Sequence, residues 1–207
     1  MKTLFEGIKN FRQQYFQKHR ELFHELENSQ QPHSLFITCS DSRVLPDIIT
    51  TSVPGELFII RNIANMVPKY SDKDAFLSVP SGLEYGVEKL NVQNIIVCGH
   101  SNCGGIASLM NPDISVMNLK FTRKWLELGN EVKIKAMKLH DEDKTQKLAE
   151  IAEKMNIIEQ MEHLMTYPFI SRNVYLNKLK IYGWYYRIDT GEVFNYNKDN
   201  GKFEIIE

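Results

Sequence analysis

The chain has 207 residues, of which 43% are hydrophobic, so it is long enough to form one domain with a sizeable core. Its 25 basic and 26 acidic residues give a formal net charge of −1, which argues against a nucleic-acid partner. Three cysteines are too few for a disulfide framework, and no segment approaches the ~20 apolar residues of a membrane span. We therefore expect no membrane partner and a reducing, cytoplasmic location.

The first segment, residues 3–28, is polar but carries apolar side chains at helical spacing, which predicts one or two amphipathic helices. It is rich in aromatic residues: Phe5, Phe11, Tyr15, Phe16 and Phe23. These rings would pack either on the rest of the same chain or on a second molecule, and the pattern alone is consistent with both.

Two short apolar runs, 35–38 and 95–98, each end in small polar residues. Each run is typical of a buried parallel strand that stops at a loop. The loops read Cys39-Ser40-Asp41-Ser42-Arg43 and His100-Ser101-Asn102-Cys103-Gly104-Gly105. Because ligand sites gather at the carboxyl ends of such strands, we expect the two loops to meet in one crevice.

The rest of the chain alternates strands with helices. Further strands are predicted at 57–60, 179–187 and 192–197, and the last two are joined by a hairpin turn at 189–191. Helices are predicted at 45–50, at 73–91 and over most of 104–167, with breaks near Asn111-Pro112 and Gly129. The expected fold is α/β, with a mainly parallel central sheet, an antiparallel edge strand and flanking helices.

The best-patterned helix is 144–165, whose apolar side chains recur at helical spacing and predict a core face. They are Leu148, Ile151, Met155, Ile158, Met161 and Met165. His140 and His163 lie on charged helices, so we do not expect either to be a metal ligand.

The two loops contain a set of side chains suited to Zn²⁺: the thiols of Cys39 and Cys103 and the imidazole of His100. Three protein ligands leave a fourth position open, as in catalytic zinc sites. Asp41 would either fill that position or lie beside it, and Arg43 could hold its carboxylate in a bidentate grip.

Cys98 offers an alternative ligand, because positions 98 and 100 share a face of an ideal strand. A local Cys98-x-His100-x-x-Cys103 site is therefore conceivable. We favour Cys98 as a buried strand residue.

The pattern CSDSR followed about sixty residues later by GHSxCGG resembles the active-site signature of the β-class carbonic anhydrases. The resemblance extends to PGELFIIRNIAN at Pro54–Asn65, SGLEY at Ser81–Tyr85 and GWYY at Gly183–Tyr186. It spans roughly Gln30 to Tyr196, most of the chain.

The resemblance implies one zinc ion per chain on Cys39, His100 and Cys103, and hydration of CO₂ to bicarbonate and a proton by zinc-bound hydroxide. It implies that Asp41 and Arg43 form a catalytic dyad that orients this hydroxide. It also places a set of residues around the substrate, with Gln30 and Tyr85 coming from a second subunit's side of the cleft: Gln30, Phe58, Ile63, Tyr85 and Gly104. Judged by residue type alone, Phe58, Ile63 and Tyr85 could equally be core residues.

The same resemblance implies a single domain over residues 1–207, in which the helical arm of residues 1–30 packs on a second subunit. The expected assembly is a homodimer or a dimer of dimers. Gly104 and Gly105 are expected to open a helix whose N-terminus helps stabilise the Cys103 thiolate.

One subgroup of this family binds bicarbonate at a regulatory pocket formed by Trp, Arg and Tyr. The matching residues here are Phe36, Arg61 and Tyr186. Phe36 has no indole N–H to donate, so we expect weak or absent bicarbonate inhibition, with Asp41 paired to Arg43.

Two other functions remain compatible with the motifs. The wider superfamily includes zinc hydrolases of CS₂ or COS that would use the same site. A non-catalytic zinc or redox-thiol module is a further alternative, although a structural site would not need the Asp41–Arg43 pair.

Overall fold

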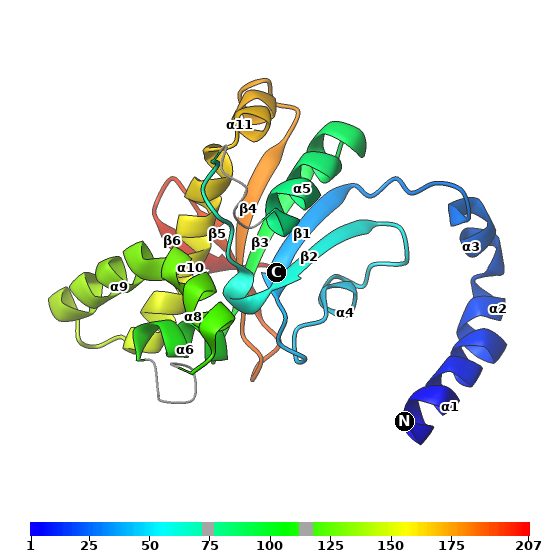
Figure 1. Ribbon diagram of the computed structural model, residues 1–207, viewed down its shortest axis with the longest axis horizontal. Helices are drawn as coiled ribbons and strands as arrows, with labels where there is room; N and C mark the ends of the chain where they lie inside the picture. The colour runs from blue at the N-terminus through cyan, green and yellow to red at the C-terminus, as the bar shows by residue number, and fades with distance from the viewer. Residues whose placement is uncertain (72–76, 112–117) are drawn as a thin grey trace.

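The computed structural model describes residues 1–71, 77–111 and 118–207. Its centre is a six-stranded sheet in the order β2-β1-β3-β4-β5-β6 (Figure 1). The strands are β1 (Ser34–Cys39), β2 (Leu57–Asn62), β3 (Asn94–His100), β4 (Lys180–Tyr186), β5 (Val193–Asn197) and β6 (Lys202–Ile205). β2, β1, β3 and β4 are parallel, whereas β5 and β6 are antiparallel additions at one edge. The predicted fold class is confirmed.

The helices differ in length and place. The N-terminal arm consists of α1 (Lys2–Asn10), a wide π-helical turn (Phe11–Tyr15), α2 (Phe16–Lys18) and α3 (Arg20–Leu26). The body carries α4 (Pro46–Thr50), α5 (Ser78–Glu84) with its extension Tyr85–Lys89, α6 (Gly104–Met110), α8 (Lys120–Leu126), α9 (Asn130–Glu142), α10 (Leu148–Met165) and α11 (Pro168–Tyr175). Short 3₁₀ turns are found at Ile63–Asn65 and Glu127–Gly129.

The two faces of the sheet are covered differently. Alternate residues of β1 and β3, such as Leu35 and Val97, point into a core shared with α5, α10 and α11. The opposite face carries Phe36, Ile96 and Cys98, and the half-buried apolar residues packed against them all come from neighbouring strands. The helices thus complete one face, while the second is built from strand residues.

α10 lies directly on the sheet because two glycines leave room for it. A Cβ at Gly183 would lie 2.5 Å from the Met161 sulfur, and one at Gly99 would lie 2.8 Å from a carbon of Ile157. The backbone of β3 and β4 is therefore in close contact with α10, from the middle of β4 to Gly99, the residue before His100.

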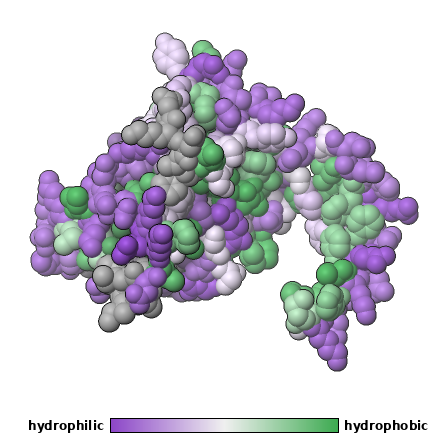
Figure 2. Space-filling view, in the orientation of Figure 1, coloured by the Kyte–Doolittle hydropathy of each residue, from purple (hydrophilic) through white to green (hydrophobic). Residues whose placement is uncertain are grey.

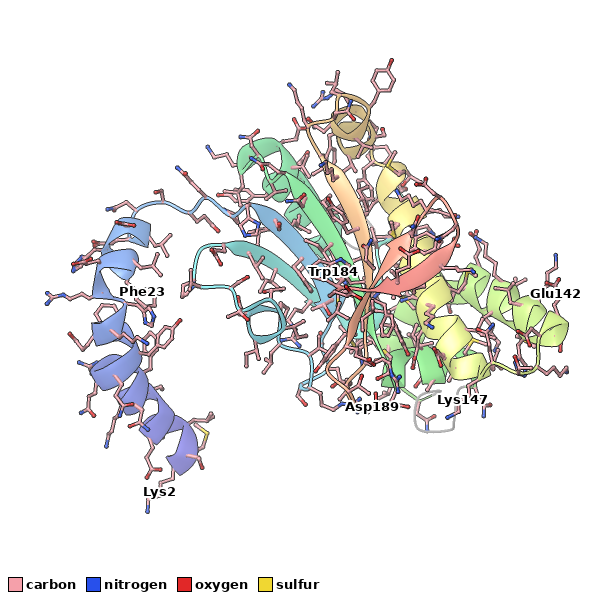
Figure 3. All side chains as sticks on the ribbon, turned by 180° about the vertical axis from the view of Figure 1, so that it is seen from behind. Lys2, Phe23, Glu142, Lys147, Trp184 and Asp189 are labelled. Atoms are coloured by element: carbon pink, nitrogen blue, oxygen red, sulfur yellow. The ribbon has the colours of Figure 1, made fainter. Side chains whose placement is uncertain are left out.

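The arm extends away from the body and is joined to β1 by residues 27–33 (Figure 1). Figure 3 shows the arm from behind, with Lys2 at the free end and Phe23 near the connection. None of the residues in α1–α3 is buried, and apolar residues run along the arm (Figure 2). The aromatic rings of the arm instead pack on one another, as in the stacked Phe16–Phe23 pair, whose ring centroids lie 5.1 Å apart.

Several predicted elements need correction. The helix predicted at 144–165 begins at Leu148, and Met165, expected in the core, is 40% exposed. The strand predicted as the last is followed by β6, so two antiparallel strands form the edge rather than one. α11 was not predicted, although Pro168 is well suited to the first position of a helix.

The helix predicted at 73–91 falls partly outside the described residues. Its described part begins at Ser78 and accommodates Pro80 in its first turn, where no helical N–H is needed. Leu83 and Val87 are buried as expected, but Leu77 is 60% exposed. Pro112 of the predicted break lies outside the described residues, while α6 ends at Met110. Across the described ranges, no helix has the length and apolar character needed to cross a membrane.

Candidate active site

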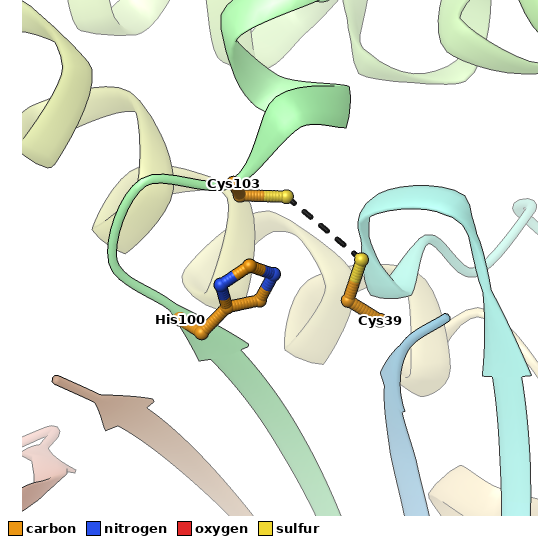
Figure 4. A group of neighbouring side chains, drawn as sticks. All are labelled: Cys39, His100 and Cys103. Carbon is orange, nitrogen blue, oxygen red and sulfur yellow. Dashed lines mark hydrogen bonds between the residues drawn. The ribbon is translucent and has the colours of Figure 1, made fainter. Parts of the chain in front are cut away.

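Three potential metal ligands meet where β1 and β3 end. Cys39 is the last residue of β1, His100 is the last of β3, and Cys103 is the residue before α6. The two sulfurs lie 3.9 Å apart, and the ring of His100 stands beside them (Figure 4). One nitrogen of His100 and the two sulfurs all lie within 4.8 Å of one another. The structure thus brings together the three residues selected from the sequence.

The orientation of His100 is fixed by its backbone. Its Nδ1 lies 2.9 Å from the carbonyl oxygen of Ser101, to which it donates a hydrogen bond. Nε2 is buried and finds no hydrogen-bond partner among the described residues. A neutral imidazole with Nδ1–H occupied in this way presents the Nε2 lone pair to a metal.

The two thiols near His100 are in contact and shift each other's pKa, whereas the third cysteine lies apart from them. The contact with Cys103 lowers the pKa of Cys39, and the same contact together with burial raises the pKa of Cys103. Burial raises the pKa of Cys98 to about 12. Cys98 packs with Phe36 and Ile96, away from the ligand group. Its interpretation as a buried strand residue is therefore favoured over ligation.

The residues fit a zinc ion. Two sulfurs and one unpartnered imidazole nitrogen, all buried, form a soft to borderline donor set of three. The site would hold Zn²⁺ through Cys39 Sγ, His100 Nε2 and Cys103 Sγ. A set of three is one short of a closed structural site, so it suits a catalytic metal.

A bidentate pair borders the ligand group. Arg43 donates from Nε to Asp41 Oδ1 at 2.9 Å and from Nη2 to Asp41 Oδ2 at 2.8 Å. Oδ2 also lies 3.8 Å from His100 Nε2, so the carboxylate faces the metal-binding side of the imidazole. The Arg43 guanidinium holds the pKa of Asp41 well below its usual range, so the carboxylate is ionised at neutral pH.

Arg61, at the end of β2, holds the loop that carries Asp41. Its Nη2 donates to the carbonyl oxygens of Cys39, Asp41 and Val44 at 3.1, 2.8 and 2.8 Å, and Nε donates to Cys39 O at 3.2 Å. The sequence indicated Arg61 only as part of an anion site. In the structure, its guanidinium fixes the shape of the first metal-binding loop.

Glu153 was not identified from the sequence. Its Oε1 accepts the backbone N–H of Cys103 at 3.0 Å, and its Oε2 accepts the Tyr185 hydroxyl at 2.8 Å. The side chain is only 5% exposed, and burial raises its pKa. A charged residue in the middle of a helix usually indicates a solvated face, so no pattern in the sequence distinguished Glu153 from its neighbours.

The residues expected around the substrate lie in two groups. Ile63 lines a cavity of about 690 Å³ together with Ser40, Arg61, Asn62 and Trp125. Trp125 donates its indole N–H to the Ile63 carbonyl oxygen at 2.8 Å and so fixes that wall.

The second group lies away from this cavity. The rings of Phe58 and Tyr85 pack against each other at a tilt of 31°, with centroids 5.9 Å apart, and Gln30 lies in the connection before β1. Within the described part of one chain, these three residues do not line the cavity beside Ser40.

The two glycines after Cys103 differ. A Cβ at Gly105 would lie 2.9 Å from side-chain carbons of Ile63 and Ala64, so glycine lets α6 approach the wall of the cavity. A Cβ at Gly104 would meet no described atom within 4 Å. Of the two, only Gly105 is required by packing.

The three residues of the expected regulatory pocket are engaged in other contacts. Phe36 is fully buried and packs edge-on against Trp184 at 5.8 Å. Tyr186 belongs to the same cluster. Arg61 is committed to the carbonyl oxygens described above.

Comparison with known proteins gives one consistent family. The family profile described as carbonic anhydrase matches residues 34–193. A carbonic anhydrase from Helicobacter pylori strain J99 is 36% identical, over 98% of this chain and 93% of that protein.

Solved structures agree with this result. The structure of the beta-carbonic anhydrase CcaA is similar with a TM-score of 0.92 at 36% identity, covering 100% of this chain and 99% of that one. A tetrameric beta-carbonic anhydrase from Sordaria macrospora is similar with a TM-score of 0.80 at 27% identity, covering 94% and 97%.

The ligand assignment predicts different outcomes for two cysteine substitutions. Cys103→Ser should lose bound zinc, because a serine hydroxyl is a poor substitute for a thiolate. Cys98→Ser should keep one zinc per chain. Metal analysis of the purified, dialysed variants measures both. Full occupancy in the Cys103 variant, or loss in the Cys98 variant, would contradict the assignment.

Proposed function

This chain belongs to the β-class carbonic anhydrases, and from that premise we propose that it hydrates CO₂ reversibly to bicarbonate and a proton at the Cys39–His100–Cys103 site. The observation that carries the proposal is the position of Asp41, whose carboxylate faces the unpartnered Nε2 of His100 while Arg43 grips it from the other side. A non-catalytic thiol or metal site would not need such a pair.

We propose that the cofactor is one zinc ion per chain. When bound, zinc supplies a water-derived nucleophile at neutral pH by lowering the pKa of water from 15.7 to about 7. The chain contributes the thiolates, the oriented imidazole and the buried carboxylate of Glu153, which fixes the backbone of Cys103.

The role we propose for Asp41 follows from its ionisation and its position. An ionised carboxylate is a hydrogen-bond acceptor only, so Asp41 accepts the hydrogen of the attacking oxygen. This hydrogen bond orients that oxygen so that its lone pair points at the carbon of CO₂. Arg43 keeps the carboxylate charged and prevents it from rotating, through two parallel hydrogen bonds. Arg43 Nη2 also donates to the Asn102 carbonyl oxygen at 3.1 Å, which ties the pair to the second loop.

We propose that the working form is a homodimer or a dimer of dimers in which the arm packs on a second subunit. Two observations support this. Large apolar side chains of the arm are exposed, including Leu4 at 66% and Phe5 at 59%. Tyr85 and Gln30 do not line their own chain's cavity, which fits the expected role at the cleft of a partner, whereas Phe58 packs against its own core.

The three cysteines bear on location. All of them lie in the described ranges and are free, buried thiols. Oxidation of Cys39 with Cys103 would remove two ligands, so the proposed site needs a reducing compartment, for which the cytoplasm is the simplest choice.

The dyad is tested by Asp41→Asn, which keeps the shape and removes the charge. We expect zinc content to be unchanged and stopped-flow CO₂ hydration to fall about ten-fold or more, as for a lost proton acceptor. Asp47→Asn, on the exposed face of α4, is the matched control and should hydrate CO₂ at the normal rate.

Two results would refute this part of the proposal. One is an Asp41→Asn variant with the normal rate from neutral to alkaline pH, which would remove Asp41 from the mechanism. The other is a wild-type protein that retains zinc and hydrolyses CS₂ or COS but leaves CO₂ unchanged, which would redirect the function to that hydrolysis.

The arm is tested by removing residues 1–28. We expect the truncated chain to be insoluble or inactive, because the apolar surface that the arm covers on its partner would be exposed to water. Light scattering after gel filtration, with CO₂ hydration on the same fractions, measures both properties. Lys18→Gln, on the charged side of the arm, should behave as wild type. A stable, active monomer without the arm would exclude the proposed packing.

Regulation by bicarbonate is expected to be weak or absent. Phe36 lacks the donor that an indole would provide, which costs roughly 1.5–3 kcal/mol for an anion. In addition, Nε and Nη2 of Arg61 already donate to backbone carbonyl groups. Hydration rate against added bicarbonate at fixed pH and ionic strength measures the effect. Steep, cooperative inhibition at millimolar bicarbonate would show that the pocket works without the indole.

A further inference from the structure

We propose that the chain holds a second divalent-cation site, formed by Glu131 of α9 and by Glu159 and His163 of α10. One ligand atom from each residue lies within 4.8 Å of the other two. The group is separate from the catalytic centre, because His163 lies ten positions along α10 from Glu153, or about 15 Å at the rise of an α-helix.

His163 provides the observation that points to a ligand. The sequence indicated a charged surface helix at this position, but the side chain is only 3% exposed. Its Nδ1 lies 2.6 Å from the Val67 carbonyl oxygen, to which it donates, so the proton is fixed on that nitrogen. Nε2 is buried without a hydrogen bond among the described residues and lies 3.2 Å from Glu159 Oε1. One nitrogen is thus anchored on a carbonyl oxygen and the other faces a buried carboxylate oxygen, as in a histidine that shares a metal ion with a carboxylate.

The two carboxylates complete a donor set of one nitrogen and two oxygens. Glu159 is only 1% exposed, and its other oxygen, Oε2, accepts a hydrogen bond from Lys135. Glu131 is exposed, and the neighbouring Lys69 lowers its pKa to about 2, so it is ionised at neutral pH. Imidazole with carboxylates suits borderline divalent ions such as Zn²⁺, Co²⁺, Ni²⁺ or Mn²⁺.

An ion can reach the group from solvent. A cavity of about 340 Å³ is lined by Pro68, Lys69, Glu127, Asn130, Glu131 and His163. Glu131 and the buried imidazole of His163 therefore both line this opening, and Glu159 lies within 4.8 Å of their ligand atoms.

A bound cation would compete with the Lys69 ammonium for the carboxylate of Glu131. Its ammonium lies 2.9 Å from both oxygens of Glu131, and its side chain is half exposed. Surface ion pairs of this kind contribute little, so Lys69 can turn to solvent when a divalent ion binds. The lysine then acts as a competitor rather than as a ligand, which gives the proposal a distinctive signature.

Bound at this site, the cation would brace the active-site wall. His163 is anchored on Val67, which follows the turn Ile63–Asn65 in the chain. An ion that joins α9 and α10 to this segment would hold it against opening. We therefore expect the ion to raise the melting temperature by several degrees at concentrations well above its dissociation constant.

The experiment uses the full-length holoprotein, with metal already bound at the cysteines, titrated with Co²⁺ by isothermal calorimetry. Metal analysis after equilibrium dialysis against Zn²⁺ gives the stoichiometry. We expect one further ion per chain. Glu131→Gln should weaken its binding at least ten-fold, and Lys69→Met should tighten it, both with CO₂ hydration unchanged.

A control variant and a third ligand variant complete the test. Glu127→Gln changes a carboxylate that lines the same cavity but lies outside the group, and it should bind the extra ion normally. His163→Gln should abolish the extra site. If that buried substitution impairs folding, the Glu131 and Lys69 variants still decide the question, because both residues are exposed.

The proposal is overturned if no ion binds beyond the cysteine site. It is equally overturned if an extra ion is bound with the same affinity by the wild type and the Glu131 variant, which would place that ion elsewhere. Unchanged affinity in the Lys69 variant would also count against it, because the group would then be a salt-bridge network that does not exchange its lysine for a metal.

Discussion

The site depends on the parallel pairing of β1 with β3 in one register. Thr38 pairs with Cys98, so Cys39 and His100 both emerge where the two strands stop. A slip of one residue would turn the alternating side chains of β1 to the other face of the sheet and carry Cys39 away from His100. Apolar burial enforces the register, because Leu35 and Ile37 must face the helices while Phe36 faces the opposite side. Chemistry at the loop ends is thus set by packing in the strands.

α10 is the second determinant, through a stripe of buried polar side chains. Glu153 binds the Cys103 N–H, Asn156 donates to Ala64 O, Gln160 accepts from Val67 N, and His163 donates to Val67 O. The positions 153, 156, 160 and 163 recur at helical spacing, so one side of the helix binds the backbone of Cys103 and of the segment 64–67. Each bond adds only about 1 kcal/mol net, but losing one partner strands a buried group at a cost of about 1–3 kcal/mol. The cost of leaving a buried polar group without a partner therefore stabilises these contacts as much as the hydrogen bonds themselves do.

The sequence predicted much of this and missed what depends on three dimensions. Apolar runs that end in Cys39 and His100 indicated the sheet, the edge of the sheet and the metal ligands. The same reasoning placed a core stripe on the methionines of α10, yet Met165 is 40% exposed and Glu159 is buried. A buried carboxylate has the same letter as a solvated one, so only its partners reveal it. Arg61 illustrates the point, because four hydrogen bonds to backbone carbonyls leave no pattern in the sequence.

The exposed arm has a consequence for how this protein exchanges hydrogen with water. The helical run from α1 through α2 has no buried residue, so it lacks the packing of an apolar face that gives most protein helices their stability. Its amides are protected only while some other surface covers them. If that surface belongs to a second subunit, deuterium enters the arm each time the subunits part, and dilution speeds the uptake. Amides of β1 and β3, which are hydrogen-bonded within the sheet, exchange only when the whole domain opens. One deuterium-uptake curve would then contain two rates: that of the arm would depend on protein concentration, and that of the sheet would depend on unfolding of the domain.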